Sequence, residues 1–301
     1  PEQLTEFIFS TRILMFQPLI LGVSSLIACF AQLKNEFIYY GVAPLGYSLG
    51  IISGIIFFYH DYGVNGIIFG VLIGALVSLF IQSLSLRAHN FSIKRHNVSF
   101  HYVKELIMFA FPRSFTNVVS QLRVVFFTAV ATTLGGGVLS SFLFAQRITD
   151  AIAQIISQSI TTASLPILSR EHEEGRIEEH EALVHKYTRV LFLTAIAICI
   201  VVYVLRYEII DVLYGATPAS NLIATFLIGF LVALPFSMVS SYLAIGFYSM
   251  KDTKRVLLGN VCATILSVSV CLYFRNDGII ALIYATISYY IISSCLYGIM
   301  Y

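Results

Sequence analysis

Charged residues are scarce in this sequence, and their scarcity decides the class of protein. Only 11% of the 301 residues are Asp, Glu, Lys or Arg, whereas a soluble domain carries about 25%. Hydrophobic residues make up 58% of the chain, and apolar stretches of roughly 20 residues recur along its whole length. No loop is long enough to bury a core of its own. The composition therefore predicts an all-α, polytopic helical membrane protein without a separate soluble domain.

The sequence also lacks the motifs of catalysis and of cofactor binding. It has no P-loop, nucleophile elbow, HExxH motif or carboxylate dyad. Its cysteines lie in apolar segments without CxxC spacing, so we interpret them as packing residues rather than as disulfide or metal sites. We therefore expect no enzyme activity, no metal site and no cofactor. The cysteines are Cys29, Cys199, Cys262, Cys271 and Cys295.

Nine apolar segments are long enough to cross a bilayer. Their connections are short, so we expect consecutive helices to be antiparallel. The chain begins at Pro1 without an initiator Met and stops at Tyr301 within an apolar run, and we expect it to be a fragment of a longer protein. The expected spans are 8–32, 37–59, 64–86, 104–133, 138–166, 187–206, 221–248, 256–275 and 279–300.

Basic residues are distributed unevenly between the two sets of alternate loops. Twelve lie in one set, and only Arg206 and Arg275 lie in the other. Because loops rich in Lys and Arg stay in the cytoplasm, the first set should face the cytoplasm and Pro1 should begin outside. The twelve residues are Lys34, Arg87, Lys94, Arg95, Lys104, Arg170, Arg176, Lys186, Arg189, Lys251, Lys254 and Arg255.

Residues 169–187 (SREHEEGRIEEHEALVHKY) are the one strongly acidic segment. Its charges recur at spacings of three and four residues, which predicts a solvated helix on the cytoplasmic face. We interpret His172, His180 and His185, which lie among its glutamates, as part of that solvated face rather than as metal ligands.

Two spans carry glycines at every fourth position. This spacing places three glycines on one helix face, which predicts a close approach of two backbones. The two sets are Gly46, Gly50, Gly54 and Gly66, Gly70, Gly74.

Four arginines and one aspartate fall inside the expected spans. Arg12 lies near the outer end of its span and Arg113 near the inner end, so either side chain can reach the lipid headgroups. Arg123 and Arg147 flank an outer turn of three glycines, and both lie about 15–18 Å below the outer surface, near the midplane. Asp150 follows Arg147 on the same helix face.

Two interpretations of these midplane charges remain open from the residues alone. An arginine at a helix centre costs about 2.5–3.5 kcal/mol even on the lenient insertion scale. In the first interpretation, Arg147 and Asp150 form a structural pair, and backbone carbonyls hold Arg123. In the second, surplus positive charge lines a water-filled cavity and binds an anion, for which the planar guanidinium suits phosphate.

Four segments carry a family resemblance. They are FIYYGVAPLGYSLGII (Phe37–Ile52), QLRVVFFTAVATTLGGGVLSSFLFAQRI (Gln121–Ile148), TTASLPILSRE (Thr161–Glu171) and GFYSMKDTK (Gly246–Lys254). In this order and spacing they resemble the MurJ (MviN) family of lipid II flippases, within the superfamily of multidrug, oligosaccharidyl-lipid and polysaccharide exporters. The strings FYxxxDT and LPxLSR are fairly specific to the family.

The resemblance implies a two-lobed, V-shaped transporter of about fourteen helices, of which this chain supplies helices four to twelve. Residues 1–102 would then end the N-terminal lobe (helices four to six), and residues 103–301 would form the C-terminal lobe (helices seven to twelve). The family moves undecaprenyl-pyrophosphate-linked disaccharide-pentapeptide from the inner to the outer leaflet of the bacterial plasma membrane. Implied partners are lipid II, membrane lipids and cell-wall synthesis proteins, with no role for nucleic acid.

The family also suggests roles for the charged residues. An arginine in its YAxR string lines a cationic cavity, and FAQR places Arg147 at that position. Arg147 and Arg123 would bind the pyrophosphate, and Asp150 would hold the Arg147 side chain in place. Arg113 would contact the substrate near the entrance and Arg12 near the exit.

Three positions depart from the family pattern. Phe127 stands where helix seven usually has an aspartate, and Arg123 where a polar residue such as Asn is usual. Ser267 stands where helix eleven usually has Asn. Some members bind sodium between these helices with such acids and amides, so these changes argue against a sodium site here.

We therefore expect a flippase for a lipid-linked cell-wall precursor that works by alternating access. A flippase for lipid-linked O-antigen or capsular oligosaccharide would differ only in the sugar, which the sequence does not identify. A cation-coupled drug exporter needs cavity carboxylates, and one aspartate among several arginines argues against it. A membrane scaffold would tolerate loss of the midplane charge, and an enzyme would need a catalytic cluster that the sequence lacks.

Overall fold

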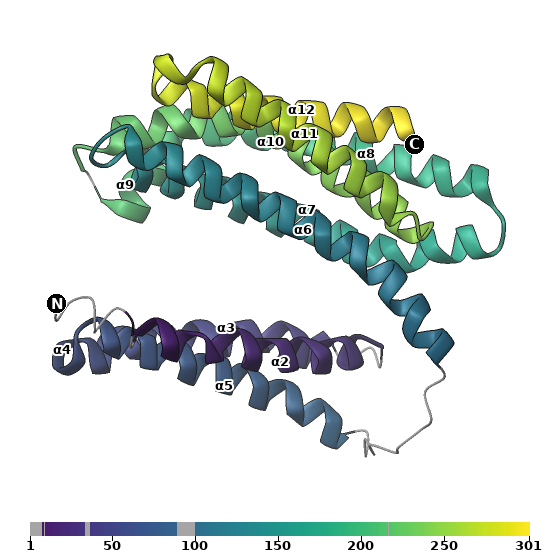
Figure 1. Ribbon diagram of the computed structural model, residues 1–301, viewed down its shortest axis with the longest axis horizontal. Helices are drawn as coiled ribbons and strands as arrows, with labels where there is room; N and C mark the ends of the chain where they lie inside the picture. The colour runs from purple at the N-terminus through teal and green to yellow at the C-terminus, as the bar shows by residue number, and fades with distance from the viewer. Residues whose placement is uncertain (1–7, 9, 34–36, 89–99, 216) are drawn as a thin grey trace. The chain divides into compact units, whose positions relative to one another are not determined.

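The computed structural model describes residues 8, 10–33, 37–88, 100–215 and 217–301. The chain divides into two compact units, Pro1–Asn97 and Val98–Tyr301, and the described part of each is helical (Figure 1). Within the described residues, nine helices are long and apolar enough to cross a membrane. This confirms the prediction of an all-α, polytopic membrane protein. Lys34, Lys94 and Arg95, on which the charge count partly rests, lie outside the described residues.

The first unit contains α2 (Phe16–Leu33), α3 (Phe37–Ser53) and α5 (Val64–Ala88). A π-helical turn at Gly54–Phe58 continues α3 into the short α4 (Tyr59–Tyr62). Helices α3 and α5 meet along the glycine ladders: a Cβ atom on Gly50 would lie 2.2 Å from the Cα atom of Gly74. The two backbones thus touch where side chains would otherwise stand, which confirms the predicted close approach.

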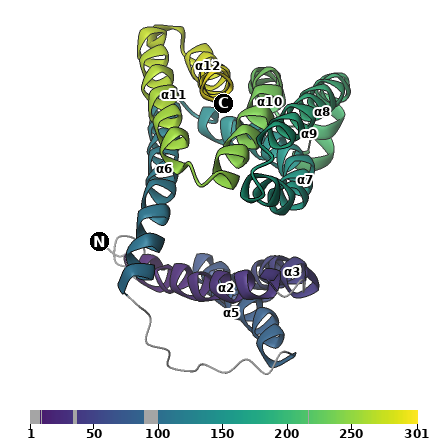
Figure 2. The ribbon, with the colours of Figure 1, turned by 90° about the vertical axis from the view of Figure 1, so that its right-hand side faces the viewer.

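The second unit is built around α10. This helix lies between α8 and α12 and also packs on α7 (Figure 2). Because it has neighbours on several sides, its sequence is apolar all round. Helix α11 packs on α6 and α12. The helices are α6 (Phe100–Thr133), α7 (Val138–Glu173), α8 (Ile177–Val204), α9 (Arg206–Tyr214), α10 (Ser220–Ser249), α11 (Thr253–Tyr273) and α12 (Ile279–Met300).

The acidic segment 169–187 differs from its prediction. It is helical, but it consists of the end of α7 and the start of α8, joined by a turn in which Gly175 has a φ of 75°. His180 is buried rather than solvated. Its Nε2 atom lies 2.8 Å from Ser249 Oγ, and its Nδ1 atom lies 2.8 Å from Tyr301 Oη. His180 therefore ties α8 to α10 and to the end of the chain after α12.

The segment GFYSMKDTK forms the turn from α10 to α11. Lys251 has a left-handed φ of 62°. Asp252 is the N-cap of α11, and its carboxylate accepts a hydrogen bond of 3.2 Å from the backbone N–H of Arg255. An acidic N-cap satisfies a backbone donor that has no partner within the helix. Asp252 in this family-specific string therefore has a structural role.

Pro235 lies inside α10 and leaves one backbone carbonyl without its helical donor. Proline has no N–H group, so the carbonyl of Leu231 cannot make its usual bond. The thiol of Cys199, in α8, donates to that carbonyl at 3.1 Å. All five cysteines lie within the described residues and are free. Cys199 thus adds a specific hydrogen bond to the packing role that we predicted.

Candidate functional site

Polar side chains form a stripe along the middle of α7. The residues recur every three or four positions, so they lie on one helix face. Arg147 and Gln154 are exposed, and the other three members of the stripe are partly exposed. A transmembrane helix that faces only lipid tails would carry apolar residues there. This face therefore suits contact with water or with a polar ligand. The stripe consists of Arg147, Asp150, Gln154, Ser157 and Thr161.

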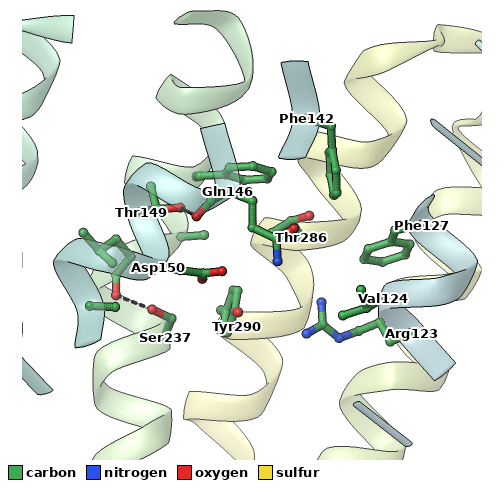
Figure 3. Close-up of a pocket in the computed structure, with 14 residues that line it drawn as sticks. Arg123, Val124, Phe127, Phe142, Gln146, Thr149, Asp150, Ser237, Thr286 and Tyr290 are labelled. Carbon is green, nitrogen blue, oxygen red and sulfur yellow. Dashed lines mark hydrogen bonds between the residues drawn. The ribbon is translucent and has the colours of Figure 1, made fainter. Parts of the chain in front are cut away.

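A small pocket lies inside the second unit, beside this stripe (Figure 3). Arg123 reaches into it from α6, and Asp150 and Gln146 line it from α7. Thr286 and Tyr290 contribute from α12. The apolar part of the wall includes Phe127, Phe142, Phe230 and Leu234. The pocket thus brings one cationic and one anionic side chain together within an otherwise largely apolar wall.

Three hydroxyl groups on the pocket wall donate hydrogen bonds to backbone carbonyls. Thr149 donates to the carbonyl of Gln146 at 2.9 Å. Ser237 and Thr286 donate to carbonyls of their own helices at 2.8 and 2.9 Å. Each hydroxyl oxygen therefore offers only lone pairs to the pocket. Arg123 is the cationic donor of the pocket.

Aromatic rings hold Arg123 in place. Its Cζ atom lies 3.8 Å from the centroid of the Tyr289 ring, 5.8 Å from that of Tyr290 and 5.7 Å from that of Phe127. Among the described residues, its buried Nε atom has no hydrogen-bond partner. The contacts that the structure gives Arg123 are thus with aromatic rings rather than with the backbone carbonyls of the first interpretation. The negative face of an aromatic ring stabilises a guanidinium in the same way that an acceptor does.

The ion pair expected between Arg147 and Asp150 is not formed. Among the described residues, no ion pair within 4.0 Å involves Asp150. Arg147 is exposed, whereas Asp150 lines the pocket together with Arg123. Spacing of three residues allows a contact on a helix but does not enforce one, because two charged side chains can each turn to a different side.

The remaining predicted arginines lie away from this pocket. Arg113, in α6, is exposed, and its Cζ atom lies 4.8 Å from the ring centroid of Tyr248 in α10. Arg12 is exposed in a helical segment that precedes α2, in the other unit. Of the five predicted site residues, the structure thus brings Arg123 and Asp150 to one pocket and places Arg147 on the adjoining stripe.

The residues that support Arg123 were missed by the sequence analysis. Asn260, in α11, donates from Nδ2 to the hydroxyl of Tyr289 and to Oγ of Ser120, each at 3.0 Å. Asn260 is only 5% exposed, and its Oδ1 atom has no hydrogen-bond partner within the part of the chain that the structure describes. A buried amide in an apolar helix was the available signal, because such a group needs a polar neighbour.

Two of the positions that depart from the family pattern make local contacts. Phe127 is buried against Arg123, and Ser267 donates its hydroxyl to the carbonyl of Thr264 at 2.9 Å. In the part of the chain that the structure describes, no group of three or more His, Cys, Asp or Glu side chains is placed to hold a metal ion.

The helix arrangement matches two solved structures. The crystal structure of MATE in the bent conformation aligns with a TM-score of 0.78 and 16% identity, over 100% of this chain and 70% of that chain. The lipid II flippase MurJ in the inward closed conformation aligns with a TM-score of 0.74 and 20% identity, over 96% of this chain and 61% of that chain. These likenesses define the class: a polytopic helical membrane protein with the fold that MATE and MurJ share.

The family follows from the sequence comparison. The model of the family described as "Lipid II flippase MurJ" matches residues 2–301, and the chain belongs to this family. The "Probable lipid II flippase MurJ" of Rhizobium tropici is 28% identical over 232 residues, which are 73% of this chain and 43% of that relative. The chain thus spans less than half of that relative's length. Family membership and the nine spans identify a multi-pass protein of the bacterial plasma (inner) membrane.

Proposed function

We propose that this protein is a flippase that moves lipid II, the undecaprenyl-pyrophosphate-linked peptidoglycan precursor, from the inner to the outer leaflet by alternating access. The observation that carries the proposal is the exposed Arg147 in the polar stripe of α7, in a chain of the MurJ family. A guanidinium binds phosphate oxygens through two parallel charge-assisted hydrogen bonds, which suits a pyrophosphate. The proposed activity is transport, with no chemical step.

In this proposal, Arg147 is the main contact of the pyrophosphate. Arg123 adds a second positive charge from the adjoining pocket, and Asp150 belongs both to the stripe and to the wall of that pocket. Arg113, which is exposed near the end of α6 predicted to be cytoplasmic, contacts the headgroup at the entrance. Arg12 contacts it near the exit. A hydrogen bond to a charged group contributes about 1.5–3 kcal/mol, so loss of Arg147 should weaken binding severely.

The mechanism also requires movement of charge across the membrane. We propose that residues 1–102 and 103–301 belong to the two lobes that rock to expose the site to each side in turn. The substrate carries its negative charge outward, and an inside-negative potential favours this by about 2.3 kcal/mol per charge for each 100 mV. Lipid II and the surrounding membrane lipids are the partners of this cycle, with cell-wall synthesis proteins as further partners.

Complementation tests the function. The full-length protein is expressed in bacteria depleted of their own lipid II flippase, beside Arg147→Ala, Arg147→Lys and the control Ile155→Ala. Ile155 is an exposed apolar residue on the same helix. We expect rescue by the wild type and by the control, none by Arg147→Ala, and partial rescue by Arg147→Lys, which keeps the charge and loses the planar fork.

Membrane insertion of each variant is measured in the same cells. Full rescue by Arg147→Ala would contradict the assigned site. Failure of a well-inserted wild type to rescue would contradict lipid II as the substrate and favour a different lipid-linked glycan.

A further inference from the structure

Arg123 and Asp150 face the same pocket, yet they are not paired. Both line its wall, Arg123 from α6 and Asp150 from α7 (Figure 3). Opposite charges attract strongly where apolar walls keep the local dielectric low. Among the described residues, however, no ion pair within 4.0 Å joins them.

The Arg123 guanidinium lies instead against the ring of Tyr289. The Arg123 Cζ atom lies 3.8 Å from its centroid, about 2 Å closer than to the rings of Tyr290 and Phe127. At this distance the guanidinium touches the ring face, where the cation–π attraction is large for a desolvated pair. Tyr289 is itself 6% exposed, so its ring has little room to move.

A hydrogen-bond network centred on Asn260 fixes the Tyr289 ring. Its hydroxyl accepts a hydrogen bond of 3.0 Å from Asn260 Nδ2. The same amide nitrogen donates to Ser120 Oγ at 3.0 Å, and Ser120 lies on α6 one turn before Arg123. These contacts therefore link α6 to α11, α11 to α12, and α12 back to α6.

We propose that Tyr289, oriented by Asn260, is a positioning residue that keeps the Arg123 guanidinium apart from Asp150 and available to an anionic headgroup. The inference rests on the proposed function for the identity of that headgroup. A guanidinium paired with Asp150 would have its charge compensated and two of its five N–H donors engaged, so it would attract a pyrophosphate less strongly. Held on the ring of Tyr289, it keeps its charge uncompensated by a bound carboxylate.

A double-mutant cycle on stability tests the positioning without any substrate. Thermal unfolding of the purified full-length protein is measured for Arg123→Gln, Asp150→Asn and the double variant, first with Tyr289 and then with Tyr289→Leu. With Tyr289 present, we expect weak coupling between the two changes, because the charges act on each other across the pocket without forming an ion pair. With Tyr289→Leu, we expect clearly stronger coupling, because Arg123 then pairs with Asp150. Coupling of equal size with Tyr289 and with Tyr289→Leu would overturn the inference.

Matched variants separate the ring from the hydroxyl. Tyr289→Phe keeps the ring face, so its cycle should show the weak coupling of the wild type, whereas Asn260→Leu releases the ring and should act as Tyr289→Leu does. If Tyr289→Leu does not fold, Asn260→Leu takes its place in the stability cycle. If both the leucine variants fold and behave as the wild type does, Tyr289 has no positioning role.

Binding of undecaprenyl pyrophosphate to the same variants links positioning to function. We expect Tyr289→Leu to weaken binding about tenfold and Tyr289→Phe by less than about threefold. Asp150→Asn should strengthen binding more in the Tyr289→Leu background than in the wild type. If the wild type does not bind the lipid, the proposed function is contradicted. The stability cycle then tests the positioning role of Tyr289 by itself. A wild type that binds, with equal Asp150→Asn effects in both backgrounds, would overturn the inference alone.

Discussion

Replacement of Gly50 by alanine tests the backbone contact between α3 and α5. The added Cβ atom would lie 2.2 Å from Gly74 Cα and 2.4 Å from Gly74 N. An ordinary contact needs at least 3.4 Å, so the helices would have to separate by about 1.2 Å at this point. Both neighbouring atoms belong to the backbone and cannot turn aside as a flexible side chain can. Overpacking of this kind costs about 1–3 kcal/mol.

Gly41→Ala is the matched control for this prediction. Gly41 lies on the same helix α3, and a Cβ atom there meets nothing within 4 Å. Thermal unfolding of the full-length protein in one detergent compares the two variants with the wild type. We expect a clear loss of stability for Gly50→Ala and little change for Gly41→Ala. Equal stability of the two variants would refute the reasoning that the glycine ladder permits a necessary close approach.

Two further predictions concern single hydrogen bonds. Cys199→Ala should lower stability by about 1–3 kcal/mol, because it leaves the Leu231 carbonyl unsatisfied in an apolar site. Cys199→Ser keeps a donor there and should lose less stability. Equal melting temperatures for Cys199→Ala and the wild type would show that the thiol is dispensable. Asp252→Ala should lower stability by about 1 kcal/mol through loss of the α11 N-cap, whereas Asp252→Asn should retain most of the capping stabilisation. An alanine variant as stable as the asparagine variant would contradict the capping role.

The spans could be predicted from the sequence because each is set by local hydropathy. The apolar run that ends before the glycine turn at Gly135–Gly137 and the run that begins after it became α6 and α7. The contact face formed by the glycine ladders was also predictable, because residues four positions apart lie on one face of a helix. The short α9 was not predicted, because a nine-residue helix with three charged residues gives no membrane-spanning signal.

The burial of His180 could not be predicted from its neighbourhood. The surrounding glutamates are typical of a solvated helix, and only the structure brings Ser249 and Tyr301 to the two ring nitrogens. These partners lie 69 and 121 residues away along the chain, so no periodicity within the segment could indicate them.

Only part of the candidate site could be predicted, again because contacts between distant parts of the chain are not visible in the sequence. Scarce intramembrane charges identified Arg123, Arg147 and Asp150, because each is costly and needs a compensating environment. Their pairing was not predictable, since it depends on which side of its helix each side chain takes. Tyr289 looked like an ordinary member of an apolar helix, and only the structure shows its ring against Arg123. Asn260 was a polar signal in an apolar helix, but the sequence did not indicate Tyr289 as its partner.

The most direct test of the central claim is a translocation measurement in liposomes. The full-length protein is reconstituted with labelled lipid II in the inner leaflet, and appearance of the label outside is followed with a membrane-impermeant reagent under an imposed potential. We predict translocation by the wild type above the protein-free rate and a background rate for an Arg147→Ala variant that is equally well reconstituted. Wild-type translocation that remains at background, or that survives Arg147→Ala unchanged, would contradict the account.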